Sequence, residues 1–194
     1  MIAAAPARSP DAARRRVRRQ LVLMVLIGLA PVVASYAIYY GWPRDRQVNY
    51  GTLIAAPSPA VTGRTLDGAP FALADLRGKW VMLAASGGGC DAACTRRLFA
   101  GRQARTIQNA ERERIVRVWL VTDDVAPPAA LLAEHDDLRV VRVPSRTAEA
   151  LPDGGRALTL VDPLGNLVLA WPTDPDVKAV AKDIGRLLRA SRIG

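Results

Sequence analysis

The chain has 194 residues, of which 50% are hydrophobic, and a formal net charge of +9. A charge of this size would indicate a nucleic-acid-binding protein if it lay on one folded face, because contacts with phosphate dominate such binding. Five of the arginines instead lie together at positions 14–19, just before an apolar segment. Membrane orientation and attraction to anionic lipid explain this placement, so we expect no nucleic-acid partner.

An uncharged apolar segment runs from Leu21 to Tyr40. A segment of about 20 residues is just long enough to cross a hydrocarbon core about 30 Å thick. Basic residues beside a span stay in the cytoplasm, so the N-terminus is expected inside and the rest of the chain outside. Tyr36, Tyr39 and Trp42 gather at the outer end, where aromatic rings suit the headgroup layer. A cleaved secretory signal is the alternative, but its apolar core would be shorter.

The apolar segment divides the chain into four regions. Residues 1–20 are rich in Ala, Pro and Arg and are expected to form an unstructured cytoplasmic tail, and residues 21–40 a transmembrane helix. Residues 41–59 lack periodicity and are interpreted as a linker, and residues 60–194 have the size of one domain. We therefore expect a single-pass protein of the bacterial inner membrane with a periplasmic domain. The Arg-rich, acid-poor N-terminus leaves the mitochondrial intermembrane space as the alternative.

The first elements of the domain alternate between strand and helix. Residues 71–80 alternate in hydrophobicity and lead through a glycine turn into a short apolar run at residues 80–85, which predicts a buried strand. Residues 95–113 are helix formers without proline and predict a long helix. A β-branched run at residues 115–121 predicts a second strand.

The later elements complete the sheet and its cover. Residues 127–134 predict a helix with proline in its first turn, and residues 138–143 a third strand. Residues 158–161 and 167–171 flank a turn with Pro and Gly and predict an antiparallel hairpin. Apolar residues at helical spacing predict a final helix at residues 177–188. This order predicts an α/β fold, in which helices flank a mixed central sheet.

The only two cysteines, Cys90 and Cys94, lie between the first buried strand and the long helix. A thiol at a helix N-terminus has a lowered pKa, which favours the thiolate that attacks disulfides or binds soft metals. Arg96 and Arg97 would add to this effect on the pKa, and Asp91 would oppose it. The two cysteines can form a disulfide if the first lies off the regular helix. A redox dithiol, a copper(I) site and a relic of either all remain open. A purely stabilising bridge is disfavoured, because so small a loop removes little unfolded-state entropy.

The cysteine spacing and the context of the pair resemble the Sco (SenC) family. The resemblance lies in the Cys-x-x-x-Cys pair at the start of a helix, the run Val118–Asp123 and the hairpin Leu158–Asn166, and it covers residues 60–194. Members of that family are membrane-anchored thioredoxin-fold proteins that deliver copper to, or reduce, the copper site of cytochrome c oxidase. The resemblance therefore implies a thioredoxin-like fold and an oxidase subunit, or another membrane-embedded protein, as partner.

The resemblance also implies roles for the two cysteines. Cys90 and Cys94 would be both the redox-active residues and the copper(I) ligands. The third copper ligand of the family, a histidine, has no counterpart at residues 153–158, and Asp91 and Thr95 stand where the family has prolines. The chain is thus expected to be a divergent member without the usual histidine.

Three other polar residues, His135, Asp123 and Asp124, are candidates for a site. His135, the only histidine, is interpreted as an exposed residue at a helix end, where its protonated ring would interact favourably with the helix dipole, and not as a third copper ligand. Asp123 and Asp124 follow the second strand and are interpreted as loop residues that cap the next helix.

Three functions fit these features. The first is an assembly factor for cytochrome c oxidase that uses Cys90 and Cys94 as thiol reductant or transient copper(I) carrier. The second is a general membrane-tethered thiol-disulfide oxidoreductase. The third is a non-catalytic module that binds an oxidase subunit. The anchor favours a partner in the membrane, because it raises the effective concentration of the cysteine pair there. Cys90, nearer the loop, is the predicted attacking thiol and Cys94 the resolving one.

Overall fold

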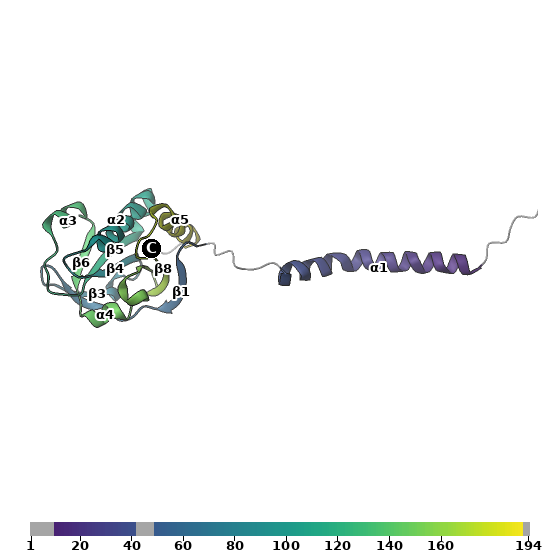
Figure 1. The fold of residues 1–194 in the computed structure, drawn as a ribbon, viewed down its shortest axis with the longest axis horizontal. Helices are drawn as coiled ribbons and strands as arrows, with labels where there is room; N and C mark the ends of the chain where they lie inside the picture. Colours follow the sequence, from purple (N-terminus) through teal and green to yellow (C-terminus); the bar gives the residue numbers. More distant parts are fainter. Residues whose placement is uncertain (1–9, 42–48, 192–194) are drawn as a thin grey trace, which may run out of the picture. The chain divides into compact units, whose positions relative to one another are not determined.

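The computed structural model describes residues 10–41 and 49–191, and the chain divides into an N-terminal unit and a C-terminal unit at residues 47 and 48. The N-terminal unit contains helix α1 (Pro10–Gly41) (Figure 1). Among the described residues, α1 is the helix long and apolar enough to cross a membrane, between Arg14 and Ala37. This helix fits a single-pass membrane protein.

The start of α1 differs from expectation. The helix begins at Pro10, so the expectation of an unstructured tail is wrong for residues 10–20. Arginine and alanine are good helix formers, and proline is well suited to the first helical position. The rings of Tyr36 and Tyr40 stack near the end of the helix, with centroids 6.1 Å apart. Residues 1–9 of the expected tail, and residues 42–48 of the expected linker with Trp42 among them, lie outside the described residues.

The C-terminal unit is built on one mixed sheet. Its strands are β1 (Thr52–Pro57), β2 (Thr62–Thr65), β3 (Pro70–Ala72), β4 (Trp80–Ser86), β5 (Ile115–Val121), β6 (Leu138–Arg142), β7 (Leu158–Val161) and β8 (Asn166–Trp171). Their order across the sheet is β1-β8-β7-β4-β5-β6-β2-β3. Strand β5 is parallel to both β4 and β6, and the other neighbouring strands are antiparallel.

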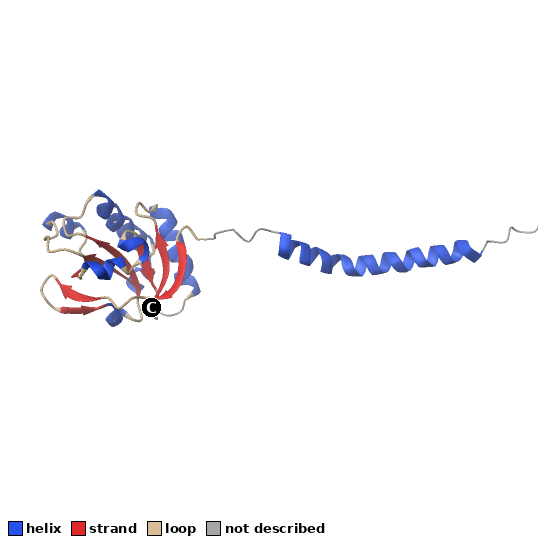
Figure 2. Cartoon of the chain, turned by 60° about the horizontal axis from the view of Figure 1, so that its bottom comes forward, coloured by secondary structure: helices blue, strands red, loops and turns tan. Residues whose placement is uncertain are grey.

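Helices cover both faces of this sheet (Figures 1 and 2). They are α2 (Ala92–Ile107), α3 (Ala129–Glu134), α4 (Ser145–Glu149) and α5 (Val177–Ala190), with 3₁₀ segments at Leu73–Leu76, Asn109–Arg114 and Pro152–Gly155. Helices α2 and α5 pack on one face together with α3. The segment Leu73–Leu76 and helix α4 pack on the other. The arrangement confirms the predicted α/β fold with helices flanking a mixed sheet.

Strand β4 lies at the centre of the core. Trp80, Met82 and Ala84 belong to the cluster under α2 and α5, while the residues between them belong to the opposite cluster. Side chains of a strand alternate between its two faces, so a strand covered on both faces needs an uninterrupted apolar run. This requirement explains why β4 was predictable. The carboxyl end of β4 leads directly into the cysteine loop.

Two sequence-based boundaries need correction. Residues 52–57, predicted as part of the linker, form β1 and pair with β8. Strand β1 is an edge strand with mostly exposed residues, so it lacks the alternating pattern that marks a half-buried strand. The long helix predicted to Glu113 ends at Ile107, and a 3₁₀ segment follows it.

Candidate functional site: the Cys90–Cys94 pair

A disulfide joins Cys90 and Cys94 between the carboxyl end of β4 and the first turn of α2. Their Cα atoms are 5.1 Å apart. Cys90 has a φ of +45° and lies before the helix, whereas Cys94 is within it. The first cysteine therefore lies off the regular helix, as a bridge at this spacing requires.

Asp91 begins helix α2 between the two cysteines. Its backbone is extended, and its side chain accepts a hydrogen bond from the backbone N–H of Cys94 at 2.8 Å. An aspartate in this position satisfies one of the free N–H groups at the helix start. Asp91 is therefore an N-cap, a role that the sequence analysis did not assign to it.

The two sulfur atoms differ in exposure. Cys94 is 1% exposed and belongs to the core, whereas Cys90 is half-buried and packs at its margin. The expectation that Cys90 is the more accessible cysteine is confirmed. Its role as the attacking thiol stays a prediction.

A short hydrogen-bonded chain leads from β5 to Cys94. The indole Nε1–H of Trp119 donates to Ser86 Oγ at 2.8 Å. The single hydroxyl hydrogen of Ser86 has two acceptors in reach, Cys94 Sγ at 3.0 Å and the carbonyl oxygen of Gly87 at 3.3 Å. Hydrogen bonds to a charged group favour its charged form, so in the reduced protein this hydroxyl would stabilise a Cys94 thiolate. Ser86 is not among the residues predicted for the site, although a serine that ends an apolar strand just before the cysteine loop is a signal in the sequence.

Asp123 holds the glycine loop that precedes Cys90. Its Oδ1 accepts hydrogen bonds from the N–H groups of Gly88 at 2.8 Å and Val125 at 3.2 Å. A Cβ atom on Gly88 would lie 2.0 Å from the carbonyl oxygen of Val125, so the two loops can approach only because this residue is glycine. The expectation that Asp123 caps the next helix is wrong, because α3 begins only at Ala129.

The two nearby arginines have other partners than the sulfurs. Arg96 is exposed and forms an ion pair with Asp174 at 3.0 Å. Arg97 is 4% exposed and donates hydrogen bonds to the carbonyl oxygens of Ala85 and Arg156. Burial lowers the pKa of Arg97, against the opposing effect of nearby carboxylates. Arg97 thus ties the loop before β7 to the end of β4, in the neighbourhood where the resemblance expects a histidine.

His135 is buried, contrary to expectation. It is 4% exposed, and its Nδ1 lies 3.2 Å from the guanidinium of Arg117, which is 2% exposed. Burial lowers the pKa of His135, and the charges of Arg117 and Arg102 lower it further. Both effects favour the neutral form of the ring. Arg117 also donates to Asp137 Oδ1 at 2.6 Å, so the arginine and the acid, and not a helix dipole, define the surroundings of His135.

Only the two sulfurs stand as soft donors at the site. Within residues 10–41 and 49–191, no group of three His, Cys, Asp or Glu side chains is placed to hold a metal ion. Two thiolates alone can bind copper(I) in low coordination. Once the disulfide is reduced, the two thiolates would form a donor set that fits copper(I), and His135 does not extend it.

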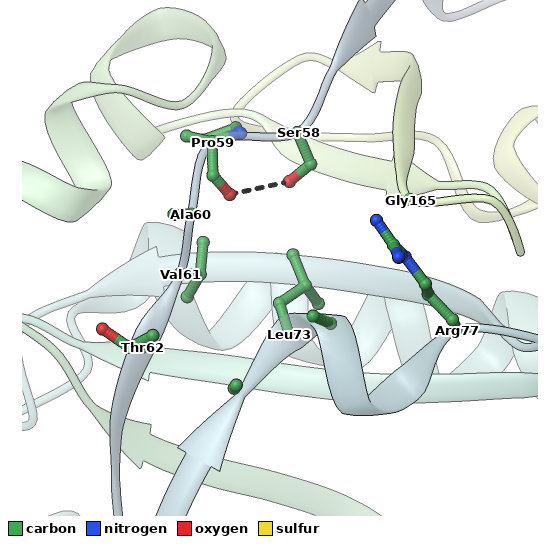
Figure 3. Close-up of a pocket in the computed structure, with 10 residues that line it drawn as sticks. Ser58, Pro59, Ala60, Val61, Thr62, Leu73, Arg77 and Gly165 are labelled. Atoms are coloured by element: carbon green, nitrogen blue, oxygen red, sulfur yellow. Dashed lines mark hydrogen bonds between the residues drawn. The ribbon is translucent and has the colours of Figure 1, made fainter.

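A pocket of about 260 Å³ lies at the opposite end of the central strands from the cysteine pair (Figure 3). It is formed by the connection from β1 to β2, the segment after β3 and the turn at Gly165, toward which Arg77 extends. Ser58 donates to the carbonyl of Pro59 at its rim, at 3.2 Å. The turn from β7 to β8 is at the amino end of β4, so the pocket is separate from the cysteine site.

Comparison with protein families gives one match. The family described as "Transmembrane-like, thioredoxin-like, C-terminal domain" matches residues 80–191. This range contains the cysteine site and the elements from β4 to α5. A comparison with curated proteins found no match.

Solved structures share the fold. Yeast Sco1 with copper bound is 16% identical, with a TM-score of 0.61, and the match covers 71% of this chain and 96% of that one. The apo Sco1 protein from Thermus thermophilus is 19% identical, with a TM-score of 0.56 and coverage of 75% and 98%. The thioredoxin domain of a thiol-disulfide oxidoreductase from Bacteroides vulgatus is 17% identical, with a TM-score of 0.53 and coverage of 71% and 99%. These similarities confirm the thioredoxin-like fold and, at the level of fold, the expected likeness to Sco proteins.

Proposed function

Because this chain belongs to the family of transmembrane-like, thioredoxin-like C-terminal domains, we propose that it is a membrane-anchored thiol-disulfide exchange protein. It acts through Cys90 and Cys94 in the assembly of cytochrome c oxidase. The observation that carries the proposal is the pairing of one accessible and one buried sulfur at the start of α2, in a thioredoxin-like fold. Such a pair suits an attacking and a resolving thiol.

The chemistry uses the two thiols in turn. In the reduced protein, the Cys90 thiolate attacks a disulfide of the partner, which releases one partner thiol and forms a mixed disulfide. Cys94 then attacks the Cys90 sulfur, the disulfide between them forms, and the second partner thiol leaves. Two electrons and, overall, two protons pass from this pair to the partner.

Three features of the site support these steps. The hydroxyl of Ser86 lies within hydrogen-bond distance of Cys94 Sγ and would stabilise the resolving thiolate. Asp123 and the glycines hold the loop in front of Cys90. The start of α2 places the positive end of a helix dipole beside Cys94. None of these groups exchanges a proton with the partner in the proposed mechanism.

The oxidase enters the proposal through the Sco-like fold. Sco proteins share the Cys-x-x-x-Cys spacing and an anchor, and an anchored dithiol has a high effective concentration for partners in the same membrane. A single-pass placement in the bacterial inner membrane, with the domain in the periplasm, completes this proposal. If the protein instead reduced disulfides in many different membrane proteins, it would be a general thiol-disulfide oxidoreductase.

An exchange assay on the full chain in lipid nanodiscs tests the proposed chemistry. The reduced protein is mixed with a small aryl disulfide, and released thiol is measured. We expect about two thiols per wild-type chain, a trapped mixed disulfide with Cys94→Ser and no reaction with Cys90→Ser. The variant Ser58→Ala, at the opposite end of the central strands, serves as the matched control. A wild-type protein that releases no thiol would contradict the proposal.

A second candidate is transient copper(I) carriage by the same two thiolates. It is favoured by the fold shared with the copper-bound yeast Sco1 structure and by the soft donor set. Titration of copper(I) into the reduced full chain should then show one bound ion in the wild type and none in Cys90→Ser. Equal binding by both would exclude the cysteine pair as the copper(I) site and leave the redox function.

A further inference from the structure

Asp183 is a buried carboxylate that the thiol chemistry does not use. It lies midway along α5, is 1% exposed, and pairs with Arg186 at 3.7 Å. Its Oδ1 accepts from the N–H of Tyr50 at 3.2 Å, and its Oδ2 accepts from the N–H of Gly51 at 2.9 Å. The indole Nε1–H of Trp171 donates to Oδ2 at 3.1 Å. One side chain thus fixes the backbone just where the chain joins the C-terminal unit.

Two further contacts hold the same point. The hydroxyl of Tyr50 accepts from the backbone N–H of Asp176 at 3.2 Å. A Cβ atom on Gly51 would lie 2.7 Å from Trp171 Nε1, so only glycine fits this approach without a shift. Asp183, Tyr50 and Gly51, which we call the tether latch, join the segment before β1 to both α5 and β8.

The tether latch lies at the same end of the strands as the cysteine pair, the carboxyl end of β4, which we call the cysteine edge. Strands β4 and β8 both run antiparallel to β7, so they point in the same direction. Strand β1 runs opposite to β8, and its first residue, Thr52, pairs with Ala170 near the carboxyl end of β8. Strands β1 and β4 are three strand positions apart in the sheet, which corresponds to about 14 Å.

Ser191, which follows the last residue of α5, lies at the opposite end of the strands. The carbonyl of Ser191 accepts from Arg114 at 2.8 Å, and Arg114 directly precedes the amino end of β5. An anchor attached after α5 would therefore join the domain at the end of the strands far from Cys90. The segment that leads from α1 instead joins the domain at Tyr50, at the end where the two cysteines lie.

We propose that the tether latch fixes the membrane tether at the cysteine edge and thereby restricts the dithiol to partner disulfides close to the membrane surface. A fully extended chain of eight residues spans at most about 28 Å, so the length of the sequence at residues 42–49 sets an upper limit on the reach of the tether. The partner is a membrane-embedded protein whose cysteines lie close to the bilayer. The inference rests on the proposed thiol-disulfide function.

The tether latch matters because the pairing of β1 with β8 alone would fix the tether only weakly to the domain. Strand β1 is an edge strand that pairs only with β8. If the latch opened and β1 detached, the tether would gain the residues up to Pro57, and the effective concentration falls as roughly the −3/2 power of tether length. We expect a decrease of about threefold for that release, and of about tenfold for an insertion of about 30 residues.

The test compares two probes on the reduced full chain in nanodiscs. One is an aryl disulfide joined to a lipid headgroup by a spacer of about 1 nm, and the other is the same disulfide free in solution. The measured quantity is the ratio of their reduction rates. An insertion of about 30 Gly and Ser residues within residues 42–48 should lower the ratio about tenfold. The same insertion after Ser191 is the matched control and should leave it unchanged.

The latch itself is tested with Asp183→Asn. Hydrogen exchange at the Gly51 amide should become about tenfold faster, because one carboxylate acceptor is lost, and the rate ratio should fall up to about threefold. If this variant does not fold, Tyr50→Phe, which removes only the acceptor of the Asp176 N–H, replaces it with a smaller change in the same direction.

The outcomes separate this inference from the proposed function. A rate ratio that does not change with tether length, or a Gly51 amide whose exchange is independent of Asp183, would overturn the inference while leaving the exchange chemistry intact. If neither probe is reduced by the wild type, the proposed function itself fails. Equal effects of the insertions at the two ends would show that the fall in the rate ratio does not come from the length of the tether, and would also overturn the inference.

Discussion

The two cysteines occupy unequal surroundings, and their reactivity should be unequal as well. Cys90 is half-buried, whereas Cys94 is 1% exposed. We expect limiting iodoacetamide to modify Cys90 first in the reduced protein, because alkylation requires an accessible thiolate. Peptide mass spectrometry of the modified chain measures this order. Earlier modification of Cys94 would reverse the assignment of attacking and resolving thiols.

Ser86 connects the cysteine to the core, since its hydroxyl accepts from Trp119 and lies within hydrogen-bond distance of Cys94 Sγ. Ser86→Ala leaves the Trp119 N–H, at a side chain that is 0% exposed, without its acceptor. We expect the free energy of unfolding of the oxidised protein to fall by about 1–3 kcal/mol. Urea denaturation measures the change, with Ser58→Ala as the control. An unchanged midpoint would mean that the hydroxyl contributes nothing to stability.

His135 makes the stability of the domain depend on pH. Its pKa is lowered by burial and by the charges of Arg117 and Arg102, with Glu134 and Asp137 acting in the opposite direction. The folded protein therefore binds a proton less readily than the unfolded chain. The stabilisation is fully present above the ordinary pKa of about 6.5 and is lost as the pH falls below it.

Denaturation midpoints at pH 7.5 and 5.5 measure this effect. We expect the wild type to lose more stability between these two values than His135→Gln, whose side chain stays neutral throughout. Parallel losses in both proteins would assign the pH dependence to other groups.

Helix α2 depends on its cap, which also positions Cys94. Asp91→Ala removes the acceptor for the Cys94 N–H, so we expect the protein to lose about 1 kcal/mol of stability. Asp91→Ser keeps an oxygen at the cap and should retain most of it. Thermal denaturation of the two variants checks the difference. Equal losses would indicate that the charge of Asp91, and not its hydrogen bond, stabilises the helix start.

The elements that could be predicted are those whose pattern reports burial. Strands β4 and β5 read as apolar runs because helices cover both faces of the sheet, and α5 has a clear apolar stripe. Strand β1 could not be predicted, because its residues are mostly exposed and its pairing with β8 is set by tertiary contacts such as those of Asp183.

The site was predictable in part for the same reason. The cysteine spacing at a strand-to-helix junction is a local signal, and it located Cys90 and Cys94. The contacts that hold them come from residues distant in sequence: Asp123 reaches the glycine loop, and Trp119 reaches Ser86. The burial of His135 was missed because its partner, Arg117, lies on a strand whose other residues are apolar.

Within residues 10–41 and 49–191, the chain combines one helix long enough to cross a membrane with a thioredoxin-like domain. A dithiol that must meet a partner in the membrane gains from such an arrangement, because the search is confined to a small volume. The sequence alone could indicate the helix, since an uncharged apolar run of this length is uncommon in water-soluble domains. It could not indicate the end of the strands at which the tether is fixed.

The central claim is that the Cys90–Cys94 pair serves oxidase assembly by chemistry and not only by binding. Cells in which the full-length Cys90→Ala/Cys94→Ala variant replaces the wild-type chain provide the most direct test. The measurement is cytochrome c oxidase activity in isolated membranes, normalised to the amount of the variant present. We predict that this activity is lost while the variant accumulates to the normal level. Oxidase activity equal to that of the wild type would contradict the claim and favour a binding module that only retains the fold.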